Sequence, residues 1–323
     1  HFGVVSSVVV PTLSILVGLV LLAAGAEGLV RGAASGARRL GLSPLLIGLT
    51  VVAYGTSAPE LVVSLQAAVG GNPDVALGNV VGSNIGNIGL ILGVAALVSP
   101  IRAKAQLLWV DIPIMIGVSA LLLALLWDGV VGRLNGGVLV LGAGAYTVVC
   151  IWGARDESQA VLEDLFDDGV PAKGSLGRDL LFGFGGLALL VLGARFLVSG
   201  AVTVAEALGI STAVIGLTVV ALGTSLPELA TSVVAALRGQ SDLALGNVVG
   251  SNVFNILGIL GITACVQPVD ATGLSWVDGG VMMGFAVLTL PLIWFDYTFS
   301  RWEGAVLIGG YAAYVAIPLT MVV

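Results

Sequence analysis

The chain has 323 residues, of which 58% are hydrophobic and only 10% are charged, and its mean hydropathy is +1.10. A typical soluble domain has about 25% charged residues, so this composition excludes a water-soluble enzyme. It also excludes a disordered chain, because disorder needs low hydrophobicity and high charge. The formal net charge of −7 argues against a nucleic-acid partner.

Apolar runs of about 20 residues predict membrane-spanning helices and not the alternating ten-residue segments of a barrel. We therefore expect an all-α polytopic membrane protein with ten spans. Most connections between these spans are short, and the exception is the acidic stretch 154–176, which we interpret as a solvated cytoplasmic loop. The predicted spans are about 12–34, 43–69, 74–98, 107–126, 133–153, 177–201, 211–237, 242–266, 275–294 and 301–322.

The basic residues predict the orientation of these spans, since Lys and Arg collect on the cytoplasmic side. With ten spans, the odd-numbered connections share one side of the membrane. Only Arg133 and Arg195 fall on the other side, so we expect cytoplasmic odd connections and two extracytoplasmic termini. The basic residues in or beside the odd connections are Arg31, Arg38, Arg39, Arg102, Lys104, Arg155, Lys173, Arg178, Arg238 and Arg301.

An internal repeat is the most informative feature of the chain. A shift of 168 residues places GLTVVAYGTSAPEL (48–61) on GLTVVALGTSLPEL (216–229), and DVALGNVVGSNIGNI (74–88) on DLALGNVVGSNVFNI (242–256). Between Ile47 and Gly93, 32 of 47 ungapped positions are identical. We therefore expect two five-helix repeats, 1–153 and 177–323, on either side of the loop.

Because five is odd, the second repeat enters the membrane in the opposite sense. Inverted repeats of this kind are typical of secondary transporters, whose substrate sites lie near the membrane midplane on interrupted helices. Gly55 and Pro59 lie within one predicted span, and Gly223 and Pro227 lie within its counterpart. Pro removes a backbone donor and Gly permits unwound backbone, so we expect broken helices here.

Glu60 and Glu228 are the acidic residues deepest in their predicted spans. An ionised carboxylate in a bilayer is costly and is therefore a functional candidate. Since the two residues occupy matching positions of inverted repeats, we expect them to converge on one central site. The hydroxyl and amide residues that accompany them are Thr56, Ser57, Thr224, Ser225, Ser83, Asn87, Ser251 and Asn255.

These candidate ligands are all oxygen donors, with no His or Cys among them. Hard oxygen ligands suit Ca²⁺, and equally Na⁺, and argue against Zn²⁺ and Cu⁺. Two carboxylates neutralise one Ca²⁺ or two monovalent ions, which is the charge balance that an exchange site needs. Asn84 and Asn252 lie off the face shared by the Ser and Asn ligands, and we expect them to pack against or bond to the broken helices.

The paired motifs GTSAPEL with GNVVGSNIGNI, and GTSLPEL with GNVVGSNVFNI, resemble the two alpha repeats of the cation/Ca²⁺ exchanger superfamily. The resemblance is greatest to its prokaryotic Na⁺/Ca²⁺ exchangers and covers the whole chain. It implies a ten-helix fold whose helices 12–34 and 177–201 slide against a core of eight. It also implies backbone carbonyl ligands at Ala53 and Ala221, beside the ligands already named.

This chain differs from several similar exchangers in having Asn255 where they carry Asp. That leaves two acidic ligands, makes K⁺ dependence doubtful and leaves the stoichiometry open. The H⁺/Ca²⁺ branch usually has Gly-Asn-Ala-x-Glu where this chain has Gly-Thr-Ser-x-Pro-Glu, which favours Na⁺ as the counter-ion.

The leading hypothesis is a plasma-membrane antiporter, functional as a monomer, that exchanges Ca²⁺ for Na⁺ without any cofactor. An H⁺/Ca²⁺ antiporter is the alternative, because buried carboxylates can bind protons. A cation channel is a third hypothesis, although channels commonly build their pores from rings of identical subunits. No nucleophile–base pair or phosphate loop points to an enzyme.

Overall fold

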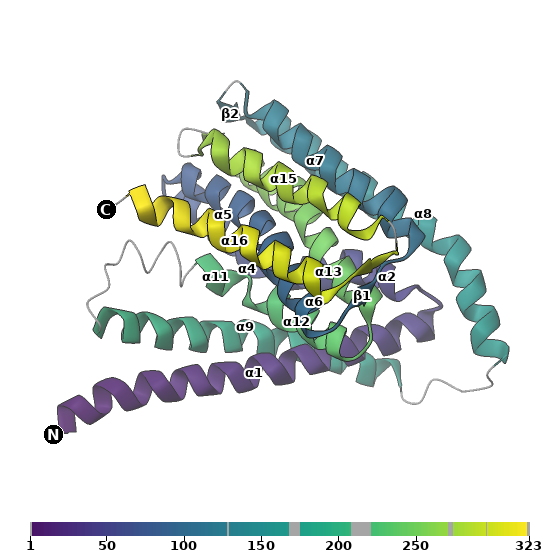
Figure 1. Cartoon of the computed structure of the whole chain (residues 1–323), viewed down its shortest axis with the longest axis horizontal. Coiled ribbons are helices and arrows are strands. Elements are labelled where there is room, and N and C mark those ends of the chain that lie inside the picture. Colours follow the sequence, from purple (N-terminus) through teal and green to yellow (C-terminus); the bar gives the residue numbers. More distant parts are fainter. Residues whose placement is uncertain are drawn as a thin grey trace.

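The computed structural model describes residues 2–127, 129–167, 175–207, 221–270, 274–294 and 296–321. Within these ranges the protein is a helical bundle with two short strand pairs (Figure 1). The helices of the first half are α1 (Phe2–Leu40), α2 (Pro44–Ile47), η1 (Gly48–Val52), α3 (Ala53–Thr56), α4 (Ala58–Val69), α5 (Pro73–Gly86), η2 (Asn87–Leu92), α6 (Gly93–Val98), η3 (Leu107–Asp111), α7 (Ile112–Leu125) and α8 (Arg133–Asp167). Those of the second half are α9 (Leu176–Ala207), α11 (Ala221–Thr224), α12 (Leu226–Leu237), α13 (Ser241–Phe254), η5 (Asn255–Leu260), α14 (Gly261–Val266), α15 (Trp276–Ile293) and α16 (Arg301–Met321).

The helices are long and apolar enough to make this a multi-pass membrane protein. Among the described residues, seven helices could cross a membrane, or eight if the bent pair Pro44–Thr56 and Ala58–Val69 is one broken span. The predicted seventh span begins at 211, and its first part, 211–220, lies outside the described residues. The predicted tenth span corresponds to α16, which is not among the seven. The count of ten spans therefore stays a prediction.

The predicted acidic loop 154–176 needs a correction, because α8 continues as a helix to Asp167. The sequence that extends it, ESQAVLEDLF, is rich in good helix formers. A charged segment outside the membrane can still be helical, so the end of the apolar run did not mark the end of the helix. Residues 168–174 lie outside the described part of the chain.

Two spans, Pro73–Val98 and Ser241–Val266, occupy the centre of the bundle. In their most apolar stretches 78% and 83% of the residues are buried, against at most 39% in the other candidate spans. Each consists of an α-helix, a π-helical segment and a second α-helix, and each carries a copy of the Gly-Ser-Asn motif. The motif is therefore held in the most buried part of the protein.

The long helices α1 and α9 lie side by side along one edge of the bundle (Figure 1). A Cβ atom added to Gly25 would lie 2.8 Å from the Gly186 carbonyl oxygen, and one added to Gly18 would lie 2.8 Å from that of Gly193. Small residues allow such close backbone approach between membrane helices. Gly18 precedes Gly25 in α1, whereas its partner Gly193 follows Gly186 in α9. The two helices therefore run antiparallel.

Two strand pairs join the halves of the chain. Strand β1 (Ile101–Arg102) pairs antiparallel with β4 (Thr298–Phe299), and β2 (Val130–Val131) pairs antiparallel with β3 (Val269–Asp270). Strand β3 follows β1 by the repeat offset of 168 residues, and β4 follows β2 by the same offset. The two pairs are therefore equivalent contacts between the halves.

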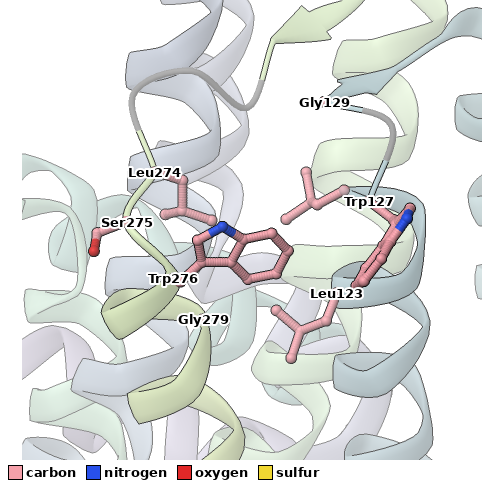
Figure 2. Close-up of a pocket in the computed structure, with 8 residues that line it drawn as sticks. Leu123, Trp127, Gly129, Leu274, Ser275, Trp276 and Gly279 are labelled. Atoms are coloured by element: carbon pink, nitrogen blue, oxygen red, sulfur yellow. The ribbon is translucent and has the colours of Figure 1, made fainter.

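Trp127 and Trp276 lie at the ends of helices α7 and α15, as expected for side chains that anchor a protein at a membrane interface. Figure 2 shows Trp127 and Trp276 on either side of a surface hollow lined by Leu123, Leu274 and Gly279. The two rings lie edge to face with centroids 6.2 Å apart, and their residues are 82% and 69% exposed.

Candidate cation site

The two broken helices are interrupted at equivalent serines. The bend between Pro44–Thr56 and Ala58–Val69 is 43°, and Ser57 at the break has φ −83° and ψ 7°. Ser225 has nearly the same backbone angles, φ −89° and ψ 7°, between α11 and α12. Each break stands two residues before a proline, Pro59 or Pro227, which cannot donate to the carbonyl four residues earlier. The predicted interruptions are therefore present in both halves.

The serine at each break contacts the glutamate of the other half. Ser57 Oγ donates to Glu228 Oε1 at 2.7 Å, and Ser225 Oγ donates to Glu60 Oε1 at 3.0 Å. Both glutamates are buried, with exposed fractions of 2% for Glu60 and 1% for Glu228. The two carboxylates therefore belong to one site that neither half completes alone.

Helix α13 reaches the first broken helix because two of its glycines leave room. A Cβ atom on Gly250 would lie 2.4 Å from the Leu49 carbonyl oxygen, and one on Gly246 would lie 2.9 Å from that of Leu45. This approach places Ser251 Oγ 3.1 Å from Ser57 Oγ, within hydrogen-bond distance. These two glycines of the second motif copy thus serve the packing that assembles the site.

Four buried asparagines connect the central helices. Asn87 Nδ2 donates to Asn252 Oδ1 at 3.3 Å, and Asn255 Nδ2 donates to Asn84 Oδ1 at 3.0 Å. Asn87 and Asn255 also begin the π-helical segments η2 and η5, and such segments often occur at functional sites. The expectation for Asn84 and Asn252 was partly wrong. Within the described residues, their side chains bond between the two central helices and to Met115 of α7, and not to the broken helices.

Four buried oxygen atoms of the site lack a hydrogen-bond partner within the described part of the chain. They are Oε2 of Glu60, Oε2 of Glu228, Oδ1 of Asn87 and Oδ1 of Asn255. An unpaired buried acceptor is costly, and here the four form two equivalent pairs, one from each half. Such an arrangement suits a ligand that accepts electron pairs, namely a cation.

The charge of the site agrees with this interpretation. In the described part of the chain, the ion pairs formed by basic residues involve other acids, and Glu60 and Glu228 form none. Nor does that part contain a cluster of three or more His, Cys, Asp or Glu residues. Two carboxylates surrounded by neutral oxygens match hard cations such as Ca²⁺ and do not match the nitrogen and sulfur preference of Zn²⁺ or Cu⁺.

The remaining predicted ligands differ in how far the structure describes them. Thr56 is fully buried, Ser83 is buried on α5, and Thr224 is half-buried beside the second break. The Ala53 carbonyl accepts the Ser57 N–H at 3.1 Å and lies 3.4 Å from Thr56 Oγ1, so its lone pairs face the helix in this structure. Ala221 begins α11, and its side chain lies outside the described set. Their roles as ligands stay predictions.

Two asparagines near the glutamates were missed in the sequence. Asn79 Nδ2 donates to the Glu60 carbonyl at 3.2 Å, and Asn247 Nδ2 donates to the Glu228 carbonyl at 3.3 Å. Asn247 Oδ1 also accepts from Thr56 Oγ1 at 3.0 Å. Both asparagines stand in the repeated LGNVVGSN segment, so their identical positions in a strongly matched stretch were a usable signal.

Fold and site together define a multi-pass helical membrane protein with a buried, oxygen-lined candidate site. The sequence pattern of the family described as sodium/calcium exchanger protein matches residues 10–152 and 179–320. The chain belongs to this family.

Curated relatives match the chain over almost its whole length. It is 34% identical to "Sodium/calcium exchanger MaX1" of Methanosarcina acetivorans, which covers 94% of this chain and 97% of the relative. It is 40% identical to "Putative antiporter CaxA" of Alkalimonas amylolytica, over 94% and 97%. It is 36% identical to "Inner membrane protein YrbG" of Escherichia coli, over 95% and 96%.

A solved structure shares the architecture. The sodium-calcium exchanger NCX_Mj, soaked with Na⁺ and Ca²⁺, superposes with a TM-score of 0.83 and 32% sequence identity. The match covers 96% of this chain and 99% of that one. The chain therefore shares the fold of a sodium-calcium exchanger.

Proposed function

We propose that this protein exchanges Ca²⁺ for Na⁺ across the plasma membrane by alternating access at one buried site. The observation that carries the proposal is the set of four unpaired oxygens on Glu60, Glu228, Asn87 and Asn255, two from each half. Their pairing across the halves is what a site at the interface of two repeats requires.

Competition between the two ions follows from the charge of the site. Two carboxylates balance one Ca²⁺ or two Na⁺ ions, and burial makes the uncompensated charges costly. The loaded protein can therefore change its accessible side more easily than the unloaded one. This difference makes the ions exchange and prevents either from leaking alone.

The names of similar proteins support this choice of ions. MaX1 is named a sodium/calcium exchanger and NCX_Mj a sodium-calcium exchanger, and both resemble the chain across nearly its full length. We extend the same ions to this chain. The predicted cytoplasmic side of the odd connections and the extracytoplasmic termini are part of the same proposal.

Proton coupling is the second candidate, and one observation favours it. Glu60 and Glu228 are buried and form no ion pair with a basic residue in the described part of the chain. Protons could neutralise these carboxylates as well as Na⁺ could. The similar protein CaxA is named only an antiporter, so its name does not separate the two candidates.

Flux measurements in proteoliposomes separate the candidates. ⁴⁵Ca²⁺ uptake is measured with independently set Na⁺, K⁺ and H⁺ gradients, and empty liposomes are the control. We expect an outward Na⁺ gradient to drive Ca²⁺ accumulation, with little effect of K⁺ or of a pH gradient imposed alone. Accumulation driven by the pH gradient without Na⁺ would show that the coupling ion is H⁺ and not Na⁺. Ca²⁺ flux that ignores every opposing gradient would indicate a channel and overturn the proposal.

A further inference from the structure

The four buried asparagines form a network that determines how two amide ligands are turned. Asn84 Nδ2 donates to the Asn252 backbone carbonyl at 3.2 Å, and this carbonyl can only accept. The nitrogen of Asn84 must therefore face Asn252, and its Oδ1 must face Asn255. Because that Oδ1 can only accept, Asn255 must offer its Nδ2, which it does at 3.0 Å.

This chain of hydrogen bonds determines which atom stands at the opposite end of the Asn255 amide, namely the oxygen. Its Oδ1 is buried and has no partner within the described residues. The same holds for Asn87, whose Nδ2 is engaged by Asn252 Oδ1 and whose Oδ1 is likewise unpaired. A rotation of either amide by half a turn would instead turn an N–H₂ group toward the unpaired side and would repel a cation.

The two equivalent contacts differ in strength. Asn84 is held by a carbonyl acceptor at 3.2 Å, whereas Asn252 Nδ2 is held by the sulfur of Met115 at 3.5 Å, and a thioether is a weak acceptor. The contact to Asn255 is also shorter than the one to Asn87. The amide orientation of Asn255 is therefore the more firmly fixed of the two.

We propose that Asn84 and Asn252 are positioning residues that fix the amides of Asn255 and Asn87, so that both present carbonyl oxygens to the transported cation. The proposal rests on the proposed function, since it concerns the same cation site. Each positioning residue comes from the half opposite its ligand. The network thus makes the ligand geometry of one half depend on the other half.

A double-mutant cycle tests this dependence. ⁴⁵Ca²⁺ exchange is measured for the wild type, Asn84→Ala, Asn255→Ala and the double variant, and half-saturating concentrations are separated from maximal rates. We expect Asn84→Ala to raise the half-saturating Ca²⁺ concentration about five- to ten-fold, the effect of one lost hydrogen bond, with a smaller change in maximal rate. Because Asn84 acts through Asn255, it should add almost nothing in the Asn255→Ala background.

The matched control combines Asn84→Ala with Asn79→Ala. Asn79 donates to the Glu60 carbonyl and to Ser64 Oγ, so it shares no hydrogen-bond partner with Asn84 among the described residues, and the two effects should multiply. Full multiplication in the Asn84–Asn255 pair would overturn the proposal, as would a lowered maximal rate with unchanged half-saturation.

If Asn84→Ala does not give a folded protein, the equivalent cycle of Asn252 and Asn87 makes the same test, with a smaller expected effect. A wild type that does not exchange Na⁺ for Ca²⁺ would refute the proposed function. Direct ⁴⁵Ca²⁺ binding to the same variants in detergent would still decide the positioning role.

Discussion

At the scale of single residues, the site depends on contacts between serines and glutamates of opposite halves. Ser57 and Ser225 each donate to the carboxylate of the other half, and the second oxygen of each carboxylate has no hydrogen-bond partner among the described residues. A hydroxyl that donates to a carboxylate fixes the direction of its second oxygen. The serines therefore determine the orientation of the two carboxylates.

Replacing either serine should weaken cation binding, and the loss of affinity should be similar for the two. We expect Ser57→Ala and Ser225→Ala each to raise the half-saturating Ca²⁺ concentration about ten-fold or more, since a hydrogen bond to a charged group is worth about 1.5–3 kcal/mol. Ser119→Ala is the control, because Ser119 is equally buried but donates to Met115 of its own helix. Equal affinities for all three variants and the wild type would refute the role of the serines.

The residue types of the site could be predicted from the sequence, but their partners could not. The repeat and the buried acids pointed to Glu60, Ser57 and their counterparts. Nothing local indicated that Ser57 would contact Glu228, which is 171 residues away, and not Glu60 on its own helix. Such pairing depends on how the halves pack, and the same limit applies to the bonds between Asn84 and Asn255.

At the scale of elements, glycine determines which helices approach closely. Within α9, a Cβ atom on Gly186 would lie 2.4 Å from the Leu29 amide nitrogen of α1, whereas one on the neighbouring Gly185 meets no described atom within 4 Å. The α1–α9 pair is therefore held by backbone contact on one face of the helix only. The helix breaks were predictable from Pro59 and Pro227. The π-helical segments η2 and η5 were not, because nothing in their residue pattern distinguishes them from α-helix.

This one-sided contact predicts a contrast between neighbouring glycines. We expect Gly186→Ala to lower stability by about 1–3 kcal/mol, because the added methyl group overpacks the interface. Gly185→Ala should leave stability unchanged or raise it slightly, since alanine favours helix. Thermal unfolding in detergent measures both. The packing account fails if the two variants unfold at the same temperature.

At the scale of the whole molecule, two equivalent strand pairs connect the halves. The β1–β4 pair joins the third and ninth predicted connections, and the β2–β3 pair joins the fourth and eighth. Each pair thus links connections that the predicted ten-span topology places on the same side of the membrane. A multi-pass helical membrane protein could be predicted because the apolar runs are strong signals, whereas the count of ten spans in two inverted repeats stays a prediction. The extension of α8 beyond residue 153 could not be predicted, because hydropathy indicates which residues lie in the membrane and not where a helix ends.

Labelling with a membrane-impermeant thiol reagent tests this topology. Cys150 and Cys265 are first replaced by alanine, and single cysteines are then introduced by Asp270→Cys or Asp296→Cys at exposed positions of the eighth and ninth connections. In intact cells we expect labelling at position 270 only, because the eighth connection is predicted to face outward. Labelling at position 296 only would reverse the orientation, and labelling at both would contradict the topology.

The central claim is that oxygens from both halves form one site for which Ca²⁺ and Na⁺ compete. Equilibrium ⁴⁵Ca²⁺ binding to the purified protein, over a range of Na⁺ concentrations, tests it most directly. The comparison includes Glu60→Gln, Glu228→Gln and, as a matched control, Glu206→Gln at an exposed position of α9. We predict that Na⁺ displaces Ca²⁺ from the wild type and the control, and that either site variant alone loses Ca²⁺ binding. Wild-type affinity in Glu60→Gln or in Glu228→Gln, or Ca²⁺ binding that Na⁺ does not weaken, would contradict the account.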